Sequence, residues 1–85
     1  MATNVKVDRN ELRELVADVL DIDPAAITDE AHFIEDLGVD SLLALEIAVT
    51  LERRYGIKIE SHEIINVVRI DDIINLLDRK LPSVI

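Results

Sequence analysis

One short segment of the chain carries side chains suited to chemistry: a serine hydroxyl beside a carboxylate at a predicted helix start. The segment is Gly38-Val39-Asp40-Ser41-Leu42. Asp40 is a good N-cap, and Ser41 is expected to present an exposed hydroxyl at the positive end of the helix dipole. A phosphodiester attached to this hydroxyl is electrostatically favoured there. Ordinary capping uses the same two residue types, so this pattern alone leaves both interpretations open.

Other patterns of catalytic or metal-binding residues are weak. His32 and His62 are the only histidines, and because neither lies in a nucleophile motif, we interpret both as surface residues. The stretch 21–23 is similar to the start of a calcium loop, but the positions up to His32 lack the other ligands and the turn glycine. Gly38 and Gly56 are too few glycines for a nucleotide-binding loop. We therefore predict no catalytic triad and no metal site.

The composition fits one small helical domain. Eighty-five residues can form a single core, and the apolar content of 49% is mostly aliphatic, with only 2% aromatic residues. We expect one domain over residues 1–85, with a core over about 8–81 and frayed termini. The chain has no cysteine, so any thiol must come from an attached group, and a reducing cytoplasm is the expected location.

The charge is strongly acidic. There are 18 acidic and 9 basic residues, giving a net charge of -9, and no Lys or Arg occurs between Glu14 and Glu52. Nucleic acid and anionic membranes are therefore poor partners. No apolar run approaches the roughly 20 residues that span a bilayer, so no membrane association is expected. A solvated acidic surface and a docking face for basic proteins are both compatible with this pattern.

Helical periodicity predicts a first helix near residues 8–20, starting with a capping pattern at Asp8. It ends at 21–24, because Asp favours turns and the residue before Pro24 disfavours helix. A long loop follows as far as Gly38, with one short helical turn expected inside it. Four apolar residues of this loop are predicted to plug the core: Ile27, Phe33, Ile34 and Leu37.

A second helix is predicted over residues 41–55, because Asp40 can cap its start and Gly56 can end it. Its apolar residues form two arcs on a helical wheel. One arc suits the core and contains Ala44, Ile47, Ala48, Leu51 and Tyr55. The other lies on the far side of Ser41 and contains Leu42, Leu45 and Val49. This helix therefore has more apolar surface than one core contact needs.

Two further helices complete the prediction. A short one is expected over residues 61–67, and a fourth over about 70–81 before Pro82. The fourth has acids in its first turn and bases in its last, as the helix dipole prefers. The predicted fold is therefore all-α. It is a small four-helix bundle of three main helices and one short helix, with a long loop between the first two.

Taken together, these motifs resemble the acyl carrier proteins and the related carrier domains of polyketide and nonribosomal peptide synthases. The matching stretches, in order, are Ile27-Thr28, Phe33, Asp36-Leu37-Gly38-Val39-Asp40-Ser41-Leu42, Leu45-Glu46-Ile47, Leu51-Glu52, Tyr55-Gly56-Ile57 and Ile59. In this family a phosphopantetheinyl transferase moves the 4′-phosphopantetheine of coenzyme A onto the serine that matches Ser41. The arm's terminal thiol then carries acyl groups as thioesters, and many members shelter the acyl chain between helices.

The resemblance implies a monomeric carrier, not an enzyme, that presents acyl cargo to partners. These would be the transferase, acyl-transfer enzymes, ketosynthases and other biosynthetic enzymes with basic docking faces. By the same resemblance, Asp40 beside this serine is expected to belong to the cofactor-binding site and matches the family's acidic recognition helix. The residues that match the family's partner-binding helix, or lie beside the serine on the same helix, are Leu42, Leu43, Leu45, Glu46, Val49 and Glu52.

The chain also departs from the fatty-acid carriers of this family. Leu43 stands where they usually carry an acid, and we expect it to be exposed. Arg53 and Arg54 lie where their recognition helix stays acidic, and the stretch 60–65 is more apolar than theirs. We interpret these differences as features of a polyketide-like, specialised carrier whose partners offer acids to the two arginines. No residue encodes the identity of the cargo.

Two alternatives remain open at this stage. A carrier of aminoacyl groups would share Ser41 and the arm, and only loading by its adenylating enzyme would distinguish it. A helical interaction module without a prosthetic group would never be modified.

Overall fold

The computed structural model describes residues 7–81, so the expected frayed termini and the predicted stop at Pro82 lie outside the described residues. Within this range the chain is all-helical and forms no strand. The elements, in order, are α1 (Arg9–Leu20), the 3₁₀ turn η1 (Pro24–Ala26), α2 (Ser41–Tyr55), α3 (Ser61–Ile65) and α4 (Ile70–Lys80). The predicted bundle of three longer helices and one short helix is confirmed.

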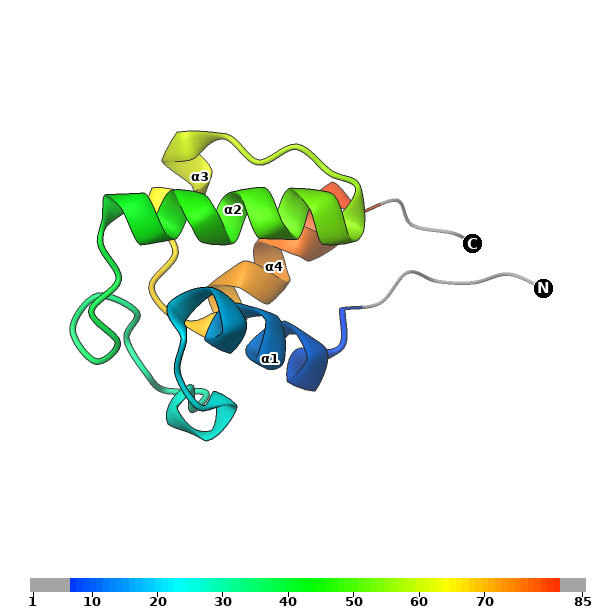
Figure 1. The fold of residues 1–85 in the computed structure, drawn as a ribbon. Helices are drawn as coiled ribbons and strands as arrows, with labels where there is room; N and C mark the ends of the chain where they lie inside the picture. The colour runs from blue at the N-terminus through cyan, green and yellow to red at the C-terminus, as the bar shows by residue number, and fades with distance from the viewer. Residues whose placement is uncertain (1–6, 82–85) are drawn as a thin grey trace.

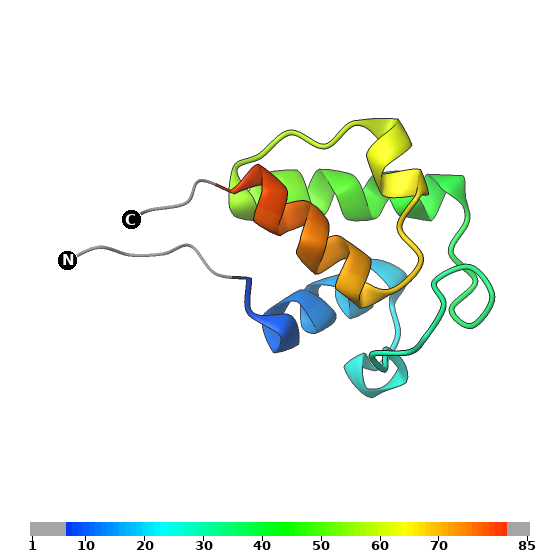
Figure 2. The same ribbon diagram turned by 180° about the vertical axis from the view of Figure 1, so that it is seen from behind.

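The helices enclose a core between α1, α2 and α4. Figure 1 shows α1 and α2 running in opposite directions, and Figure 2 shows α4 crossing obliquely between them. In both views α3 lies against the first turns of α2, near the loop that leads into that helix. No helix within residues 7–81 is long and apolar enough to cross a membrane.

Side-chain and backbone caps set the helix ends at the predicted places. The Asp8 carboxylate accepts the N–H groups of Asn10 and Glu11 at the start of α1. Asp21 ends that helix in the left-handed conformation, with φ 58°, a geometry that Asp tolerates better than most side chains. Gly56 ends α2 in the same way, with φ 66°. Local sequence therefore determines where α1 and α2 begin and end.

The core is aliphatic and includes part of the long loop. Leu12, Leu51 and Leu77 are fully buried, and Ile27 and Phe33 from the loop pack into the same cluster. Burial of this apolar surface is the main force that holds a chain of this size together.

Ile34 was predicted to pack into the core, but this prediction was wrong, because its side chain is 57% exposed. The backbone explains the difference. The Phe33 N–H donates to the carbonyl of Val68 (2.8 Å), and the Val39 N–H donates to the carbonyl of Phe33 (2.8 Å). These bonds hold Phe33 and Val39 with their side chains buried, which leaves the intervening Ile34 at the surface.

The third helix is shorter than predicted, because it ends at Ile65 and not at residue 67. The side-chain amide of Asn66 donates to the His62 carbonyl (2.9 Å), which satisfies a backbone acceptor at the helix end. Val67 is buried but follows the helix, while Ile65 is 55% exposed.

Ionic contacts tie the loop and α4 to α1. The Arg13 Nε donates to the carbonyl of Ile27 (2.7 Å), and the same guanidinium pairs with Asp29. Arg9 pairs with Asp29 (3.3 Å) and with Asp71 in the first turn of α4 (2.6 Å). The long loop is thereby fastened to the side of α1.

Candidate functional site

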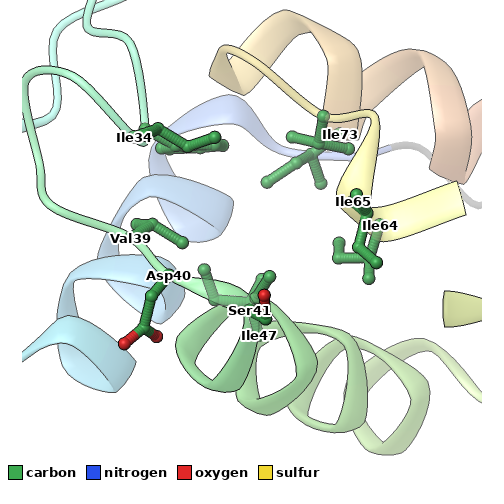
Figure 3. Close-up of a pocket in the computed structure, with 11 residues that line it drawn as sticks. Ile34, Val39, Asp40, Ser41, Ile47, Ile64, Ile65 and Ile73 are labelled. Carbon is green, nitrogen blue, oxygen red and sulfur yellow. The ribbon is translucent and has the colours of Figure 1, made fainter. Parts of the chain in front are cut away.

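Ser41 is the first residue of α2 and is exposed. The Asp40 carboxylate caps the helix by accepting the Leu43 N–H (2.9 Å), as the sequence predicts. In Figure 3 this carboxylate points away from the neighbouring cavity, whereas Ser41 lies at the cavity's edge. The cap therefore holds the helix start in place while the serine hydroxyl stays accessible.

The helix start next to Ser41 suits a phosphate group. The backbone N–H groups of Ser41 and Leu42 make no hydrogen bond with any of residues 7–81. Such unsatisfied donors, at the positive end of the 15-residue helix, are what a phosphate oxygen needs. A phosphodiester on the Ser41 hydroxyl would lie within reach of both donors. The residues present thus fit an attached phosphopantetheine.

An apolar cavity of about 300 Å³ opens beside Ser41. It lies between the start of α2, the loop before it, α3 and α4 (Figure 3). Nine of its eleven lining residues are apolar, and the two polar ones are Asp40 and Ser41. The apolar lining consists of Phe33, Ile34, Val39, Ala44, Ile47, Ile64, Ile65, Val67 and Ile73. The site therefore combines an exposed hydroxyl, free amide donors and a cavity for an apolar group.

The second apolar arc of α2 is exposed, as its position on the helical wheel suggests. Leu42 is 66% exposed, Leu45 40% and Val49 44%. Glu46 is also exposed and lies on the same side of the helix. These four predicted docking residues therefore form one accessible stripe that starts beside Ser41, and we refer to it as the α2 stripe.

The expectation that Leu43 is exposed was wrong, because its side chain is half-buried against the core. On a helical wheel Leu43 lies only about 40° from the buried Ile47, so it belongs to the flank of the core arc. Arg54 lies on the same flank and is also not free, since it pairs with Glu11 of α1 and lies over the Tyr55 ring (5.7 Å to its centroid). This flank of α2 lies toward α1.

Glu52 has a structural contact that its sequence position did not reveal. It is half-buried, and its carboxylate accepts the backbone N–H of Ile59 at 2.8 Å. The bond ties the last turns of α2 to the connection that leads into α3. Only a tertiary contact could show this, because the two residues lie seven positions apart across a turn.

The two histidines differ. His62 is exposed, as predicted, but His32 is half-buried, and its Nδ1 accepts the N–H groups of Ile34 (3.2 Å) and Glu35 (3.1 Å). His32 therefore shapes the loop before α2 and is not a plain surface residue. Among residues 7–81 no three His, Cys, Asp or Glu side chains are grouped so that they could hold a metal ion.

Comparison with known proteins identifies the family that has this arrangement. A family model described as the phosphopantetheine attachment site matches residues 10–77, which include nearly all of the helical bundle. The chain belongs to the acyl carrier protein family. It is therefore a carrier and not a catalyst, phosphopantetheine is its cofactor, and it acts together with biosynthetic enzymes.

Three relatives show how far the similarity of this carrier extends. Polyketide-8 synthase acyl carrier protein 2 of Streptomyces avermitilis is 49% identical over 79 residues, covering 93% of this chain and 91% of the relative. The acyl carrier protein of Helicobacter pylori is 33% identical over 72 residues, or 84% of this chain and 92% of its own length. The acyl carrier protein of Campylobacter concisus is 35% identical over 69 residues, which cover 81% of this chain and 90% of the relative.

Proposed function

We propose that this carrier holds acyl intermediates as thioesters on a phosphopantetheine arm attached to Ser41 and presents them to the enzymes of one pathway. The observation that supports the attachment point is the exposed Ser41 hydroxyl beside two unsatisfied amide donors at the start of α2. When bound, the arm supplies the thiol that this cysteine-free chain lacks. The adjacent cavity supports a second element of the proposal, that part of the cargo is sheltered beside the arm.

Arm attachment would be carried out by a phosphopantetheinyl transferase. The Ser41 Oγ forms a new bond to the phosphorus next to the pantetheine of coenzyme A, and the diphosphate bond of coenzyme A breaks. Adenosine bisphosphate leaves, and the serine proton passes to a base of the transferase. Asp40 contributes by fixing the first turn of α2 through its bond to the Leu43 N–H (2.9 Å).

The α2 stripe is the proposed docking face. Its three apolar side chains extend along α2 from a start beside Ser41, and Glu46 offers a carboxylate to a basic residue of the partner. Arg53 is exposed at the far end of the same helix and would meet an acid on the partner. Leu43 and Glu52 are weaker candidates for contact with a partner, because both are half-buried.

The proposed pathway is polyketide-like. Support comes from the relative of that name, which is 49% identical, whereas the relatives named simply acyl carrier protein are 33% and 35% identical. A monomer acting in the cytoplasm belongs to the same proposal, in keeping with the absence of cysteine and the net charge of -9. Turnover of the loaded carrier by a polyketide ketosynthase should exceed turnover by a fatty-acid ketosynthase, and the reverse order would contradict this part.

The attachment site is tested by intact-mass analysis. Incubation with coenzyme A and a broad-specificity transferase should add the mass of one phosphopantetheine to the wild type and none to Ser41→Ala. Ser61 is a matched control, because it is also an exposed first residue of a helix, so Ser61→Ala should be modified like the wild type. Circular dichroism is used to check that each variant is folded. Modification of Ser41→Ala, or loss of modification in Ser61→Ala, would contradict the assignment.

A further inference from the structure

Two large apolar side chains outside the α2 stripe remain exposed at the cavity. Ile34 is 57% exposed and Ile65 is 55% exposed, and both belong to the cavity lining. They come from different segments, Ile34 from the loop before α2 and Ile65 from the last position of α3. Figure 3 shows them on opposite sides of the space above Ser41. Exposed apolar surface at a cavity is unfavourable in water unless a ligand covers it.

Backbone and side-chain bonds hold both segments in place. The Ile34 N–H donates to His32 Nδ1 (3.2 Å), and the Ile34 carbonyl accepts the Gly38 N–H (3.1 Å). On the other side, Glu63 in α3 accepts the Glu60 N–H (2.9 Å) and pairs with Lys80 of α4 (2.8 Å). The two isoleucines are therefore presented from fixed positions.

The cavity interior offers no polar side chain to a buried cargo. Its two polar lining residues are both exposed, and the Asp40 carboxylate is already bonded to the Leu43 N–H. A ketone or hydroxyl group that loses water without gaining a hydrogen bond is strongly disfavoured. A methylene group loses nothing there and gains contact with the apolar walls. The interior therefore distinguishes cargo by polarity.

The volume limits the length of cargo. A cavity of about 150 Å³ is enough to bind benzene, so one of twice that volume has room for on the order of ten carbon atoms. A reduced aliphatic chain of that size would fill the space and reach Ile34 and Ile65 at its exposed edge.

We propose that Ile34 and Ile65 determine which acyl groups this carrier shelters. Their side chains extend the apolar wall to the entrance and favour a reduced aliphatic chain over an oxygen-rich chain of the same length. The proposal rests on attachment of the arm at Ser41. Residues deeper in the cavity, such as Ile47 and Ile64, are core residues with 2% and 3% exposure, so they also stabilise the fold. Ile34 and Ile65 are free of that role.

The proposal is tested by the reactivity of the thioester. The carrier is loaded with an octanoyl group, or with an acyl group of equal length in which two methylenes are replaced by ether oxygens. Hydroxylamine nitrogen attacks the thioester carbonyl, the carbon–sulfur bond breaks, a hydroxamate forms and the arm keeps a free thiol. Intact mass follows the rate. In the wild type the octanoyl group should react several-fold more slowly than the ether-containing group, because it is sheltered.

The double variant Ile34→Ser/Ile65→Ser should raise the octanoyl rate by roughly tenfold, since apolar contact at the entrance is lost. The rate of the ether-containing group should not change. Ile22→Ser is the control, because Ile22 is also exposed but lies outside this cavity and outside the α2 stripe, and it should behave like the wild type. The single variants Ile34→Ala and Ile65→Ala should give smaller increases in the same direction.

A second measurement locates the cargo directly. Loading with octanoyl should shift the backbone amide resonances of cavity residues such as Ile47, Ile64 and Val67 in the wild type, and much less in the double variant. Equal reactivity of the two cargoes in the wild type, or an unchanged octanoyl rate in the double variant, would overturn the proposal while leaving Ser41 as the attachment site. Absence of the arm from Ser41 would overturn both proposals.

Discussion

The α1–α4 side of the molecule and the α2–α3 side are built differently. Leu12 in α1 and Leu77 in α4 are completely buried, and the Arg9–Asp71 pair (2.6 Å) joins the same two helices. On the other side α3 buries one residue, Ile64, leaves its neighbour Ile65 more than half exposed, and lines a cavity of about 300 Å³. The α1–α4 side therefore packs tightly into the core, whereas the side that contains α3 keeps room beside Ser41.

The comparison implies that the exposed residues at the cavity contribute little to stability. A five-residue helix gains little from its own backbone, because helix initiation is costly and few turns follow. The α3 helix is held by the buried Ile64, by its capping box and by the Glu63–Lys80 pair. Substitutions on the α1–α4 side should therefore change the free energy of unfolding, whereas exposed α3 residues should change cargo exposure.

The largest expected effect comes from Leu77, one of two buried leucines of α4. Leu77→Ala should lower the free energy of unfolding by about 2–5 kcal/mol, because it removes apolar contacts and leaves a void. Ile65→Ala on the cavity side should change it by no more than about 0.5 kcal/mol, as exposed substitutions usually do. Urea denaturation followed by circular dichroism measures both. Similar losses in the two variants would remove the distinction between the two sides.

Arg13 provides the next largest effect. Arg13→Ala should destabilise the protein by about 1–3 kcal/mol, because it leaves the Ile27 carbonyl without its charged donor and breaks the pair with Asp29. Arg53→Ala is the matched control, since Arg53 is exposed, and it should be nearly neutral. The same urea titration applies. A neutral Arg13→Ala would show that the long loop needs no fastening to α1.

The main helices could be predicted because their signals are local. Asp40 and Gly56 flank an unbroken apolar periodicity, and α2 begins and ends where these two residues place it. The proposed attachment serine could be singled out for the same reason, since it lies one residue after a strong N-cap. Periodicity and capping depend only on neighbours in sequence, so they remain visible without the structure.

The predictions of burial that were wrong concern residues whose exposure depends on contacts with residues far away in the sequence. Ile34 was placed in the core, but the pairing of Phe33 with Val68, 35 residues later, turns it to the surface. Leu43 was expected to be exposed, but it is half-buried on the flank of α2 that lies toward α1, where Arg54 pairs with Glu11. The cavity itself is formed by four separate segments and has no signature in any one of them.

The N-cap beside Ser41, Asp40, can be compared with Asp8, the N-cap of α1. Asp40→Ala should cost about 1 kcal/mol of stability, and Asp8→Ala, which uncaps α1, should cost a similar amount. Only Asp40→Ala should slow arm transfer at limiting transferase, because it loosens the first turn that holds Ser41. Transfer is followed by intact mass and stability by urea. Equal transfer rates in the two variants would show that Asp40 is no more than a cap.

The smallest expected effect is the pH dependence of the α3 anchor. Hydrogen bonding to Lys80 lowers the pKa of Glu63 from its ordinary value, with a further contribution from the Glu60 N–H. A carboxylate with a lowered pKa in the folded state stabilises that state above its unfolded pKa of about 4.3. The contribution is lost as pH falls through the lower folded value. Wild type should therefore melt at a higher temperature than Glu63→Gln at pH 7, and the difference should shrink below about pH 4.3.

Glu63→Gln is informative because its amide oxygen can still accept the Glu60 N–H, so the change removes the charge and keeps the capping bond. Lys80→Gln, which removes the other half of the pair, should show the same convergence with the wild type at low pH. Added salt should reduce both differences at pH 7, since the pair is partly exposed and screened over ~8 Å at physiological ionic strength. A difference in melting temperature that stays constant from neutral to acid pH would mean that hydrogen bonding alone, and not charge, anchors α3 beside the cavity.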